Sequence, residues 1–227
     1  MDIAEYLIEE LECETVFTIP IFGGIDVSES TVVTWGIMVV LILGSFIMTR
    51  NLKVDHISKR QAVVELLVTK LTGMCESMIG KEGKEYVTYL TSILIYIGIA
   101  NVVGIFGLKP PTKDLSVTIA MAVMSIVLVE FAGIRRKGVG GALHKLIEPV
   151  PVVAPLNVLE IVTKPLSLCM RLFGNVLGAF VIMELLKKVV PIFVPAVFCL
   201  YFDVFDGLLQ AYVFVFLTSI YIKEAIE

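Results

Sequence analysis

Long runs of apolar residues constrain the fold of this chain more than any other feature of its sequence. Four of them stand out, at residues 31–48, 87–107, 115–133 and 189–222. About 20 helical residues cross a hydrocarbon core that is about 30 Å thick, so the last run is longer than one perpendicular helix requires. A further apolar segment surrounds Arg171. We therefore predict an all-α polytopic membrane protein with about five membrane-embedded helices.

The overall composition agrees with a membrane protein. Hydrophobic residues make up 57% of the chain and the mean hydropathy is +0.92, above the usual range of soluble proteins. No polar segment is long enough to bury a core of its own, so residues 31–227 are expected to form a single membrane domain. Residues 1–30 contain eight acidic residues and neither Lys nor Arg, unlike the basic start of a secretory signal peptide.

Basic residues suggest how the chain is oriented. Two groups follow the first and third apolar runs, namely Arg50, Lys53, Lys59 and Arg60, and then Arg135, Arg136, Lys137 and Lys145. The tendency of basic loops to stay in the cytoplasm places the acidic N-terminal segment outside and the C-terminus inside. A minority of lysines then falls outside, against this rule: Lys109, Lys113, Lys187 and Lys188.

The segments between the runs carry weaker signals. Residues 61–86 have apolar positions at helical spacing interrupted by charges, which fits an interfacial amphipathic helix or a surface helix packed on a partner. The GVGG stretch at 138–141 indicates a flexible turn, and Pro191 and Pro195 separate the last two helices.

Several chemistries are not expected. The four cysteines (Cys13, Cys75, Cys169 and Cys199) lack metal-ligand spacing and are interpreted as small packing residues. The sequence has no phosphate-binding loop of the GxxxxGK[ST] type, so nucleotide hydrolysis by this chain alone is not expected. We predict no metal, no cofactor and no nucleic-acid partner.

Arg171 lies within an apolar segment and heads the list of candidate functional residues. A charge at membrane depth costs at least about 3 kcal/mol, and arginine does not escape this cost by losing its proton. Five residues at spacings of 3, 4, 4 and 3 share its helical face: Lys164, Ser167, Arg171, Asn175 and Gly178. Leu166, Met170, Phe173 and Val176 are assigned to the opposite side. A structural alternative is an arginine that extends to the lipid headgroups.

A second polar set lies in the last apolar run. Asp203, Asp206 and Gln210 also share a helical face, and intramembrane carboxylates are able to bind and release protons. The alternative is that both aspartates lie at the aqueous end of the helix. Glu184, Glu130 and Asp114 are further candidates for an ion path, although Asp114 is equally suited to cap the helix that follows it.

At this point the sequence resembles a known family. RLFGN at 171–175, preceded by KPLSL, is similar to the signature of subunit a of the bacterial F-type ATP synthase membrane sector. Further similar strings follow the family's order between about residues 31 and 222: PPTKDLSVT at 110–118, GVGG at 138–141, PLNVLE at 155–160 and GLLQAYVFVFLTSIYI at 207–222.

The resemblance implies a stator subunit that is not catalytic alone. It would form two ion half-channels in a bacterial plasma membrane, pack its last two helices as a tilted hairpin against a ring of c subunits, and bind b-type peripheral stalk subunits. Arg171 would act on the ring carboxylates, with Gln210 nearby. The remaining positions that the resemblance implicates are Asn175, Ser167, Asp203, Asp114, Asn101 and Glu160.

One departure from the resemblance concerns the outer half-channel. Many relatives have a glutamate nine residues after the arginine, and this chain has Phe180, with Glu184 one turn further on. The translocated ion, H⁺ or Na⁺, stays open. Two other functions also stay open on residues alone: a secondary transporter that binds an anionic substrate through Arg171, and a non-conducting membrane scaffold.

Overall fold

The computed structural model describes residues 15–19, 25–50, 52, 58–147, 154–189 and 194–226. Cys13, Lys53 and the prolines at 149, 151 and 191 lie outside these ranges, as do residues 1–14 of the acidic segment. The longer helices are α2 (Glu29–Thr49), α3 (Lys59–Ile79), α4 (Val87–Val102), α5 (Leu115–Ile147), α6 (Ala154–Val189), α7 (Val194–Cys199) and α8 (Gly207–Ile226). Short 3₁₀ turns are η1 (Lys84–Tyr86), η2 (Val103–Phe106) and η3 (Pro111–Lys113), and a π-helix, η5 (Leu200–Asp206), joins α7 to α8.

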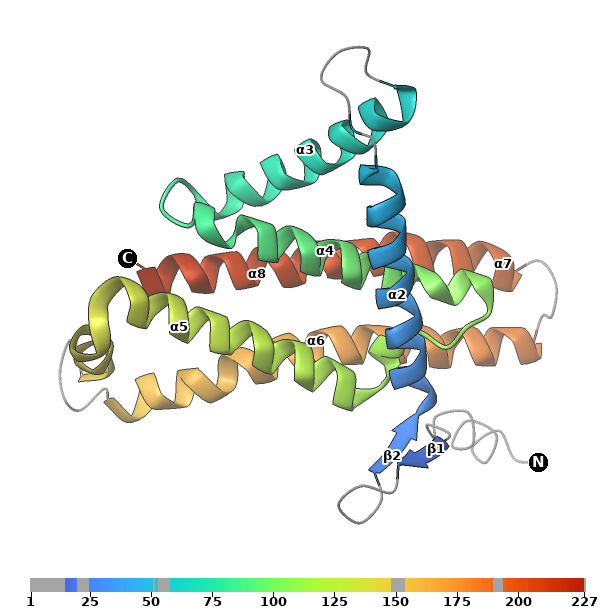
Figure 1. Ribbon diagram of the computed structural model, residues 1–227. Helices are drawn as coiled ribbons and strands as arrows, with labels where there is room; N and C mark the ends of the chain where they lie inside the picture. Colours follow the sequence, from blue (N-terminus) through green and yellow to red (C-terminus); the bar gives the residue numbers. More distant parts are fainter. Residues whose placement is uncertain are drawn as a thin grey trace.

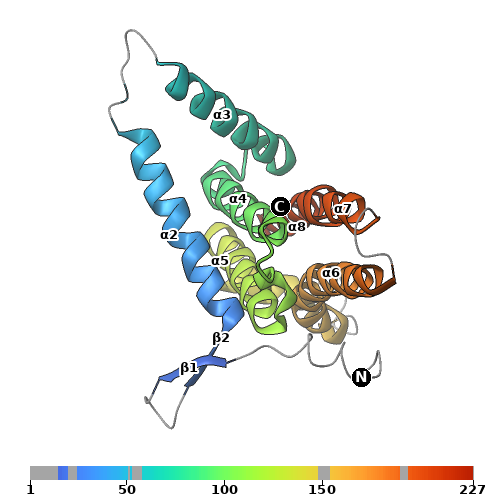
Figure 2. The same ribbon diagram turned by 90° about the vertical axis from the view of Figure 1, so that its right-hand side faces the viewer.

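Five helical segments of the described chain are long and apolar enough to cross a membrane. They are α2, α4 with its flanking turns, the first part of α5, α6, and the continuous α7–η5–α8 rod. The expected all-α polytopic fold is confirmed. Four of them, α4, α5, α6 and α8, run side by side, while α2 crosses the bundle (Figure 1). Figure 2 shows these four nearly end-on.

The core of the bundle lies where α8 meets α4 and α5, and where α5 meets α6. Leu90 and Ile97 of α4 and Val215 and Ile222 of α8 are fully buried there. Because lipid is as apolar as these side chains, close packing supplies much of the association between membrane helices. By contrast, α2 presents most of its apolar residues outward.

The amphipathic segment forms α3, which is not among the five spans. Its C-terminal end is anchored, since Cys75 and Ile79 are buried beside α4 and α8. Apolar residues nearer its N-terminus, such as Leu66 and Val63, are exposed. One end of α3 therefore packs on the bundle, and the other end leaves an apolar surface uncovered.

The N-terminal part contains a β-hairpin that the sequence analysis did not anticipate. Strands β1 (Thr15–Ile19) and β2 (Ile25–Ser28) pair antiparallel with an irregularity between Thr15 and Phe17. The strands are rich in β-branched residues, which favour extended structure, but both are too short to stand out beside the acidic residues. The hairpin leads directly into α2 and ends at Ser28, whose Oγ donates a hydrogen bond to Asp114 Oδ2 over 3.1 Å.

Two helices depart from regular α geometry. Helix α5 continues past its basic residues to Ile147 with a break at Gly138, whose φ of 74° favours glycine; the expected flexible turn is thus a kink within a longer helix. In η5, the N–H of Gly207 reaches back to the carbonyl of Phe202, five residues earlier. The α-helical spacing assumed for Asp203 and Asp206 therefore does not apply through this turn.

Candidate ion path

The polar stripe on α6 faces away from the bundle. Ser167, Arg171 and Asn175 are all exposed, as their shared spacing predicts. The buried side of α6 consists of Leu168, Cys169 and Leu172, and it meets α5, where the Thr118 hydroxyl lies 3.5 Å from Cys169 Sγ. Leu166 and Met170, which the spacing assigns to the side away from the polar stripe, are 56% and 52% exposed and do not belong to this buried side. A helix packed along one narrow strip leaves apolar residues uncovered on both sides of the polar stripe.

Arg171 has no ion-pair or hydrogen-bond partner among the residues that the structure describes. Every other charged residue of α6 within that part of the chain does have one. A guanidinium keeps its charge in all accessible conditions. A permanent charge on an outward surface of a membrane helix is costly unless it meets water or an anionic group.

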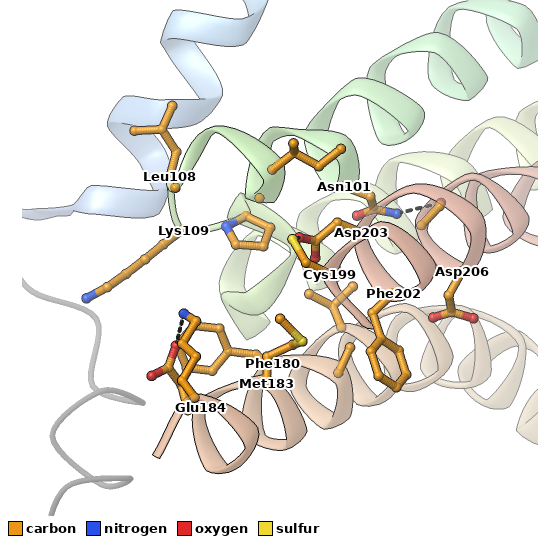
Figure 3. A pocket seen from close by; sticks show the side chains of 18 residues that line it. Asn101, Leu108, Lys109, Phe180, Met183, Glu184, Cys199, Phe202, Asp203 and Asp206 are labelled. Atoms are coloured by element: carbon orange, nitrogen blue, oxygen red, sulfur yellow. Dashed lines mark hydrogen bonds and ion pairs between the residues drawn. The ribbon is translucent and has the colours of Figure 1, made fainter. Parts of the chain in front are cut away.

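A cavity of about 580 Å³ lies beside the C-terminal half of α6. Its walls come from three places: the end of α4 with the loop that follows, the C-terminal half of α6, and η5 with its flanking residues. In Figure 3, Phe180 and Met183 project from α6 on one side, and Cys199 and Asp203 lie on the other. The cavity thus joins the two helices that carry the predicted polar sets.

Three carboxylates line this cavity: Glu184, Asp203 and Asp206. Glu184 is 8% exposed, and its Oε1 accepts a hydrogen bond from Lys187 Nζ over 2.6 Å. The Asp203 Oδ2 atom accepts one from the Cys199 thiol over 2.8 Å. Among the described residues, neither aspartate has an ion-pair partner. The cavity therefore contains one carboxylate, that of Glu184, whose charge is balanced by a lysine, and two, those of Asp203 and Asp206, without an ion pair among the described residues.

Asn101 connects two elements of the cavity wall through hydrogen bonds of its side chain. Its side-chain Nδ2 donates to the carbonyl oxygen of Gly207 over 2.9 Å, and its Oδ1 accepts from the Thr112 hydroxyl over 2.7 Å. Gly207 allows this approach, since a Cβ there would lie 2.8 Å from Asn101 Cβ. Asn101 thus holds the end of α4 against the start of α8, at the rim where it also lines the cavity.

Phe180 fills the position at which the resemblance suggested an acidic group. The Lys113 ammonium lies 3.7 Å from the centre of its ring, and Lys113 is only 5% exposed. A cation over an aromatic face is attracted by the ring quadrupole. Phe180 therefore lines the cavity with an aromatic ring in place of a titratable acid, and the buried Lys113 ammonium packs over that ring.

The remaining predicted residues occupy separate places. Gln210 is 7% exposed on α8 and does not line the cavity, and no hydrogen bond joins it to Arg171 within the described residues. Asp114 caps α5, since its Oδ1 accepts from the Ser116 N–H over 2.9 Å. Glu160 is exposed at the far end of α6, with its Oε2 atom 3.2 Å from Lys164 Nζ.

Sequence reasoning missed two of the groups that shape the cavity. Cys199 had been assigned to packing together with Cys75 and Cys169, which are indeed buried, yet its thiol faces the cavity and binds Asp203. Gly104 carries no side-chain signal, but a Cβ there would meet the Asp203 carboxyl group at 3.1 Å. Of these two contacts with Asp203, only that of Cys199 was visible in the sequence, because the two residues are four positions apart.

The fold and these sites define a polytopic membrane protein in which one helix carries both an arginine without a partner among the described residues and part of the wall of a cavity that contains carboxylates. A sequence profile described as ATP synthase A chain matches residues 31–223. The chain therefore belongs to the ATP synthase subunit a family, and it is the non-catalytic, ion-channel-forming stator subunit of an ATP synthase membrane sector. The transporter alternative is not favoured by this result.

Relatives in this family cover most of the chain. It is 39% identical over 207 residues to an "ATP synthase subunit a" of Moorella thermoacetica, which covers 90% of this chain and 94% of the relative. It is 32% identical over 205 residues to "ATP synthase subunit a 1" of Crocosphaera subtropica, with 89% of each chain covered. It is also 32% identical over 219 residues to "ATP synthase subunit a, sodium ion specific" of Propionigenium modestum, covering 89% of this chain and 75% of that one.

Proposed function

We propose that the cavity is the outer ion half-channel and that Arg171 faces a ring of c subunits, each with a carboxylate at membrane depth. One observation carries the proposal: a single helix, α6, presents Arg171 on its outward face, without a partner among the described residues, and Phe180, Met183 and Glu184 in the cavity. A fixed positive charge within about 4–6 Å of a carboxylate favours its ionised form. Arg171 would thus empty each ring site as it passes and block direct ion flow between half-channels.

The entry route runs from Glu184 toward Asp203 and Asp206. Phe180 has no exchangeable proton, so the carboxylates on either side of the cavity are the groups able to accept an incoming ion. The Glu184 charge is balanced by Lys187, which leaves Asp203 and Asp206 as the stronger attractions for a cation on this route. Asn101 shapes the wall, while Gln210 lies past the cavity on α8.

The inner half-channel is assigned to the opposite end of the α6–α8 hairpin. There Lys164 Nζ lies 2.9 Å from Glu224 Oε1 of α8 and 3.2 Å from Glu160 Oε2 of α6. Ser167 lies one turn from Lys164 on the same exposed face as Arg171. An ion that leaves the ring would pass this charged end of the hairpin.

The proposed orientation is the one that the basic residues suggest, with the N-terminus outside a bacterial plasma membrane and the C-terminus in the cytoplasm. Arg135 and Arg136 of α5 lie beside Glu85 and Glu82 at the inner end. The outer-side lysines that ran against the rule have local partners, since Lys109 lies 3.7 Å from Glu29 and Lys187 is paired with Glu184. The proposed partners are the c ring and b-type peripheral stalk subunits.

Either H⁺ or Na⁺ is compatible with this cavity, because carboxylate oxygens bind protons as well as hard cations. The family includes a member named for sodium specificity. The coupling ion is identified by measuring ATP synthesis against Na⁺ concentration at constant membrane potential. Synthesis that requires Na⁺ identifies sodium, and synthesis that does not require Na⁺ identifies protons.

The test compares ATP synthesis by the whole complex in vesicles after Asp203→Asn, Glu184→Gln and the double substitution. We expect Asp203→Asn to slow synthesis and the double variant to nearly stop it, since the cavity then keeps only one of its three carboxylates, that of Asp206. Glu130→Gln is the matched control, because Glu130 is an exposed carboxylate of α5 that does not line the cavity. Full activity of an assembled double variant would contradict the proposed entry route.

A further inference from the structure

The Asp203 carboxylate is held in a specific place by contacts with two residues, Cys199 and Gly104. Its Oδ2 accepts the Cys199 thiol proton, and its carboxyl group lies against Gly104 of η2. A Cβ on Gly104 would stand 3.1 Å from both Cγ and Oδ1 of Asp203. We propose that Cys199 and Gly104 are positioning residues that fix the Asp203 carboxylate at the cavity wall for ion transfer.

The contact with Gly104 sets where the carboxylate lies. Gly104 is in the 3₁₀ turn that ends α4, three residues after Asn101, whose side chain ties this end of α4 to Gly207. Because Asn101 ties the end of α4 to the start of α8, the η2 turn that contains Gly104 has a fixed position beside the Asp203 carboxyl group. An alanine there would require the Asp203 carboxyl group to shift by a few tenths of an ångström, because a carbon–carbon contact of 3.1 Å is tighter than most real ones.

The thiol sets the orientation of the carboxylate without neutralising it. Cys199 is the last residue of α7 and lies one turn before Asp203, where the chain enters η5. A thiol is a weak hydrogen-bond donor and carries no charge while protonated. An ammonium or guanidinium in its place would form a charge-assisted bond of roughly twice the strength and compete with an incoming cation. The thiol thus holds one oxygen and leaves the carboxylate charge available.

The inference rests on the proposed role of Asp203, and a double-mutant cycle tests it in vesicles that hold the whole complex. Cys199→Ala should lower the rate of ion-driven ATP synthesis by about two- to tenfold, the range expected for one ordinary hydrogen bond, since a thiol is a weak donor. Cys199→Ser should restore most of the rate, because a hydroxyl donates to the same oxygen. In an Asp203→Asn background, Cys199→Ala should have no further effect.

Gly104→Ala tests the second contact. It should slow synthesis by a factor similar to that of Cys199→Ala, while Gly44→Ala, where a Cβ would meet nothing within 4 Å, should not change it. Assembly is checked by recovery of the intact complex, so that a failure to assemble is not counted as slow transport.

Modification of Cys199 by a small methanethiosulfonate reagent, which forms a mixed disulfide with the thiolate and releases methanesulfinate, is a second readout that does not depend on turnover. The thiolate is the reactive form, and the adjacent Asp203 charge opposes it. Asp203→Asn should therefore speed the modification of Cys199, with the buried Cys75 as an internal control that stays unchanged.

The outcomes separate the two proposals. If Asp203→Asn slows synthesis but Cys199→Ala and Gly104→Ala do not, the positioning inference is wrong and the entry route stands. If Asp203→Asn leaves synthesis unchanged, the entry route fails, and with it the inference. A Cys199→Ala effect of equal size with and without the Asp203 carboxylate, or a serine variant as slow as the alanine one, would also overturn the inference.

Discussion

Arg171 is the one charged residue of α6 that has no partner within the described chain. At 4 Å and an effective dielectric constant of 20, two opposite charges attract by about 4 kcal/mol, or about a thousandfold in an ionisation equilibrium. A neutral amide such as that of Gln210 supplies a hydrogen bond of only about 0.5–1.5 kcal/mol. The two residues therefore differ in what they are able to do to a ring carboxylate.

Replacing the arginine should accordingly be decisive. Arg171→Ala is expected to abolish ion-driven ATP synthesis in reconstituted vesicles, since no remaining charge favours the ionised ring carboxylate. Passive ion leak through the membrane sector is measured in the same vesicles by the decay of an imposed gradient. Synthesis near the unmodified rate would contradict the assigned role of this residue.

The glutamine should matter less. Gln210→Ala is expected to lower synthesis roughly two- to tenfold, the factor that corresponds to one neutral hydrogen bond. Ser219→Ala is a suitable control on the same helix, because the buried Ser219 hydroxyl donates only to the carbonyl of Phe216. A Gln210→Ala variant as inactive as Arg171→Ala would reverse this hierarchy.

At the scale of single elements, the N-terminal end of α5, which is its proposed outer end, is built around Asp114. Its Oδ1 caps the helix through the Ser116 N–H, and its Oδ2 accepts from Ser28, at the start of α2. Asp114 does not line the cavity. Both contacts are structural, which favours the capping alternative over a place in the ion path.

This assignment predicts a loss of stability without a loss of transport. Asp114→Ala should destabilise the outer end of α5 by about 1 kcal/mol, the usual effect of removing an N-cap. Asp114→Asn should not, because asparagine caps as well as aspartate does. The measurements are the thermal midpoint of the purified complex and its synthesis rate per assembled complex. A slow but normally stable Asp114→Asn variant would return Asp114 to the ion path.

At the scale of the whole molecule, the bundle leaves one face of α6 uncovered. That face carries Ser167, Arg171 and Asn175, flanked by exposed Leu166 and Met170. An apolar surface that surrounds a permanent charge is suited to a membrane protein partner with a carboxylate at the same depth. Helix α5 has an exposed apolar face as well, at Val127 among others, and we do not expect the ring there.

Photo-crosslinking distinguishes these faces in the assembled complex. Asn175→p-benzoylphenylalanine should form covalent adducts with the c subunit on irradiation, because this position lies one turn from Arg171 on its exposed face. The same substitution at Val127 should give adducts with lipid or with other subunits. Adducts with the c subunit from Val127 and none from Asn175 would place the ring on the wrong side of the bundle.

The number of spans, the amphipathic character of α3, the family and the polar stripe around Arg171 were all readable from the sequence. They follow from local properties: run length, helical periodicity and motif strings depend on residues close together in the chain. The exposure of Ser167, Arg171 and Asn175 was predictable for the same reason, since residues on one face of a regular helix share one environment.

Only the tertiary structure decided which groups meet at the cavity. The contact of Gly104 with Asp203 joins η2 to η5, and that of Lys113 with Phe180 joins η3 to α6; both depend on how separate elements pack. The π-helix at Leu200–Asp206 changes the rotation of the last span by an amount that α-helical spacing does not anticipate. The buried face of α6, at Leu168 and Leu172, was decided by where α5 lies, because almost all sides of a membrane helix are apolar and periodicity alone does not choose between protein and lipid.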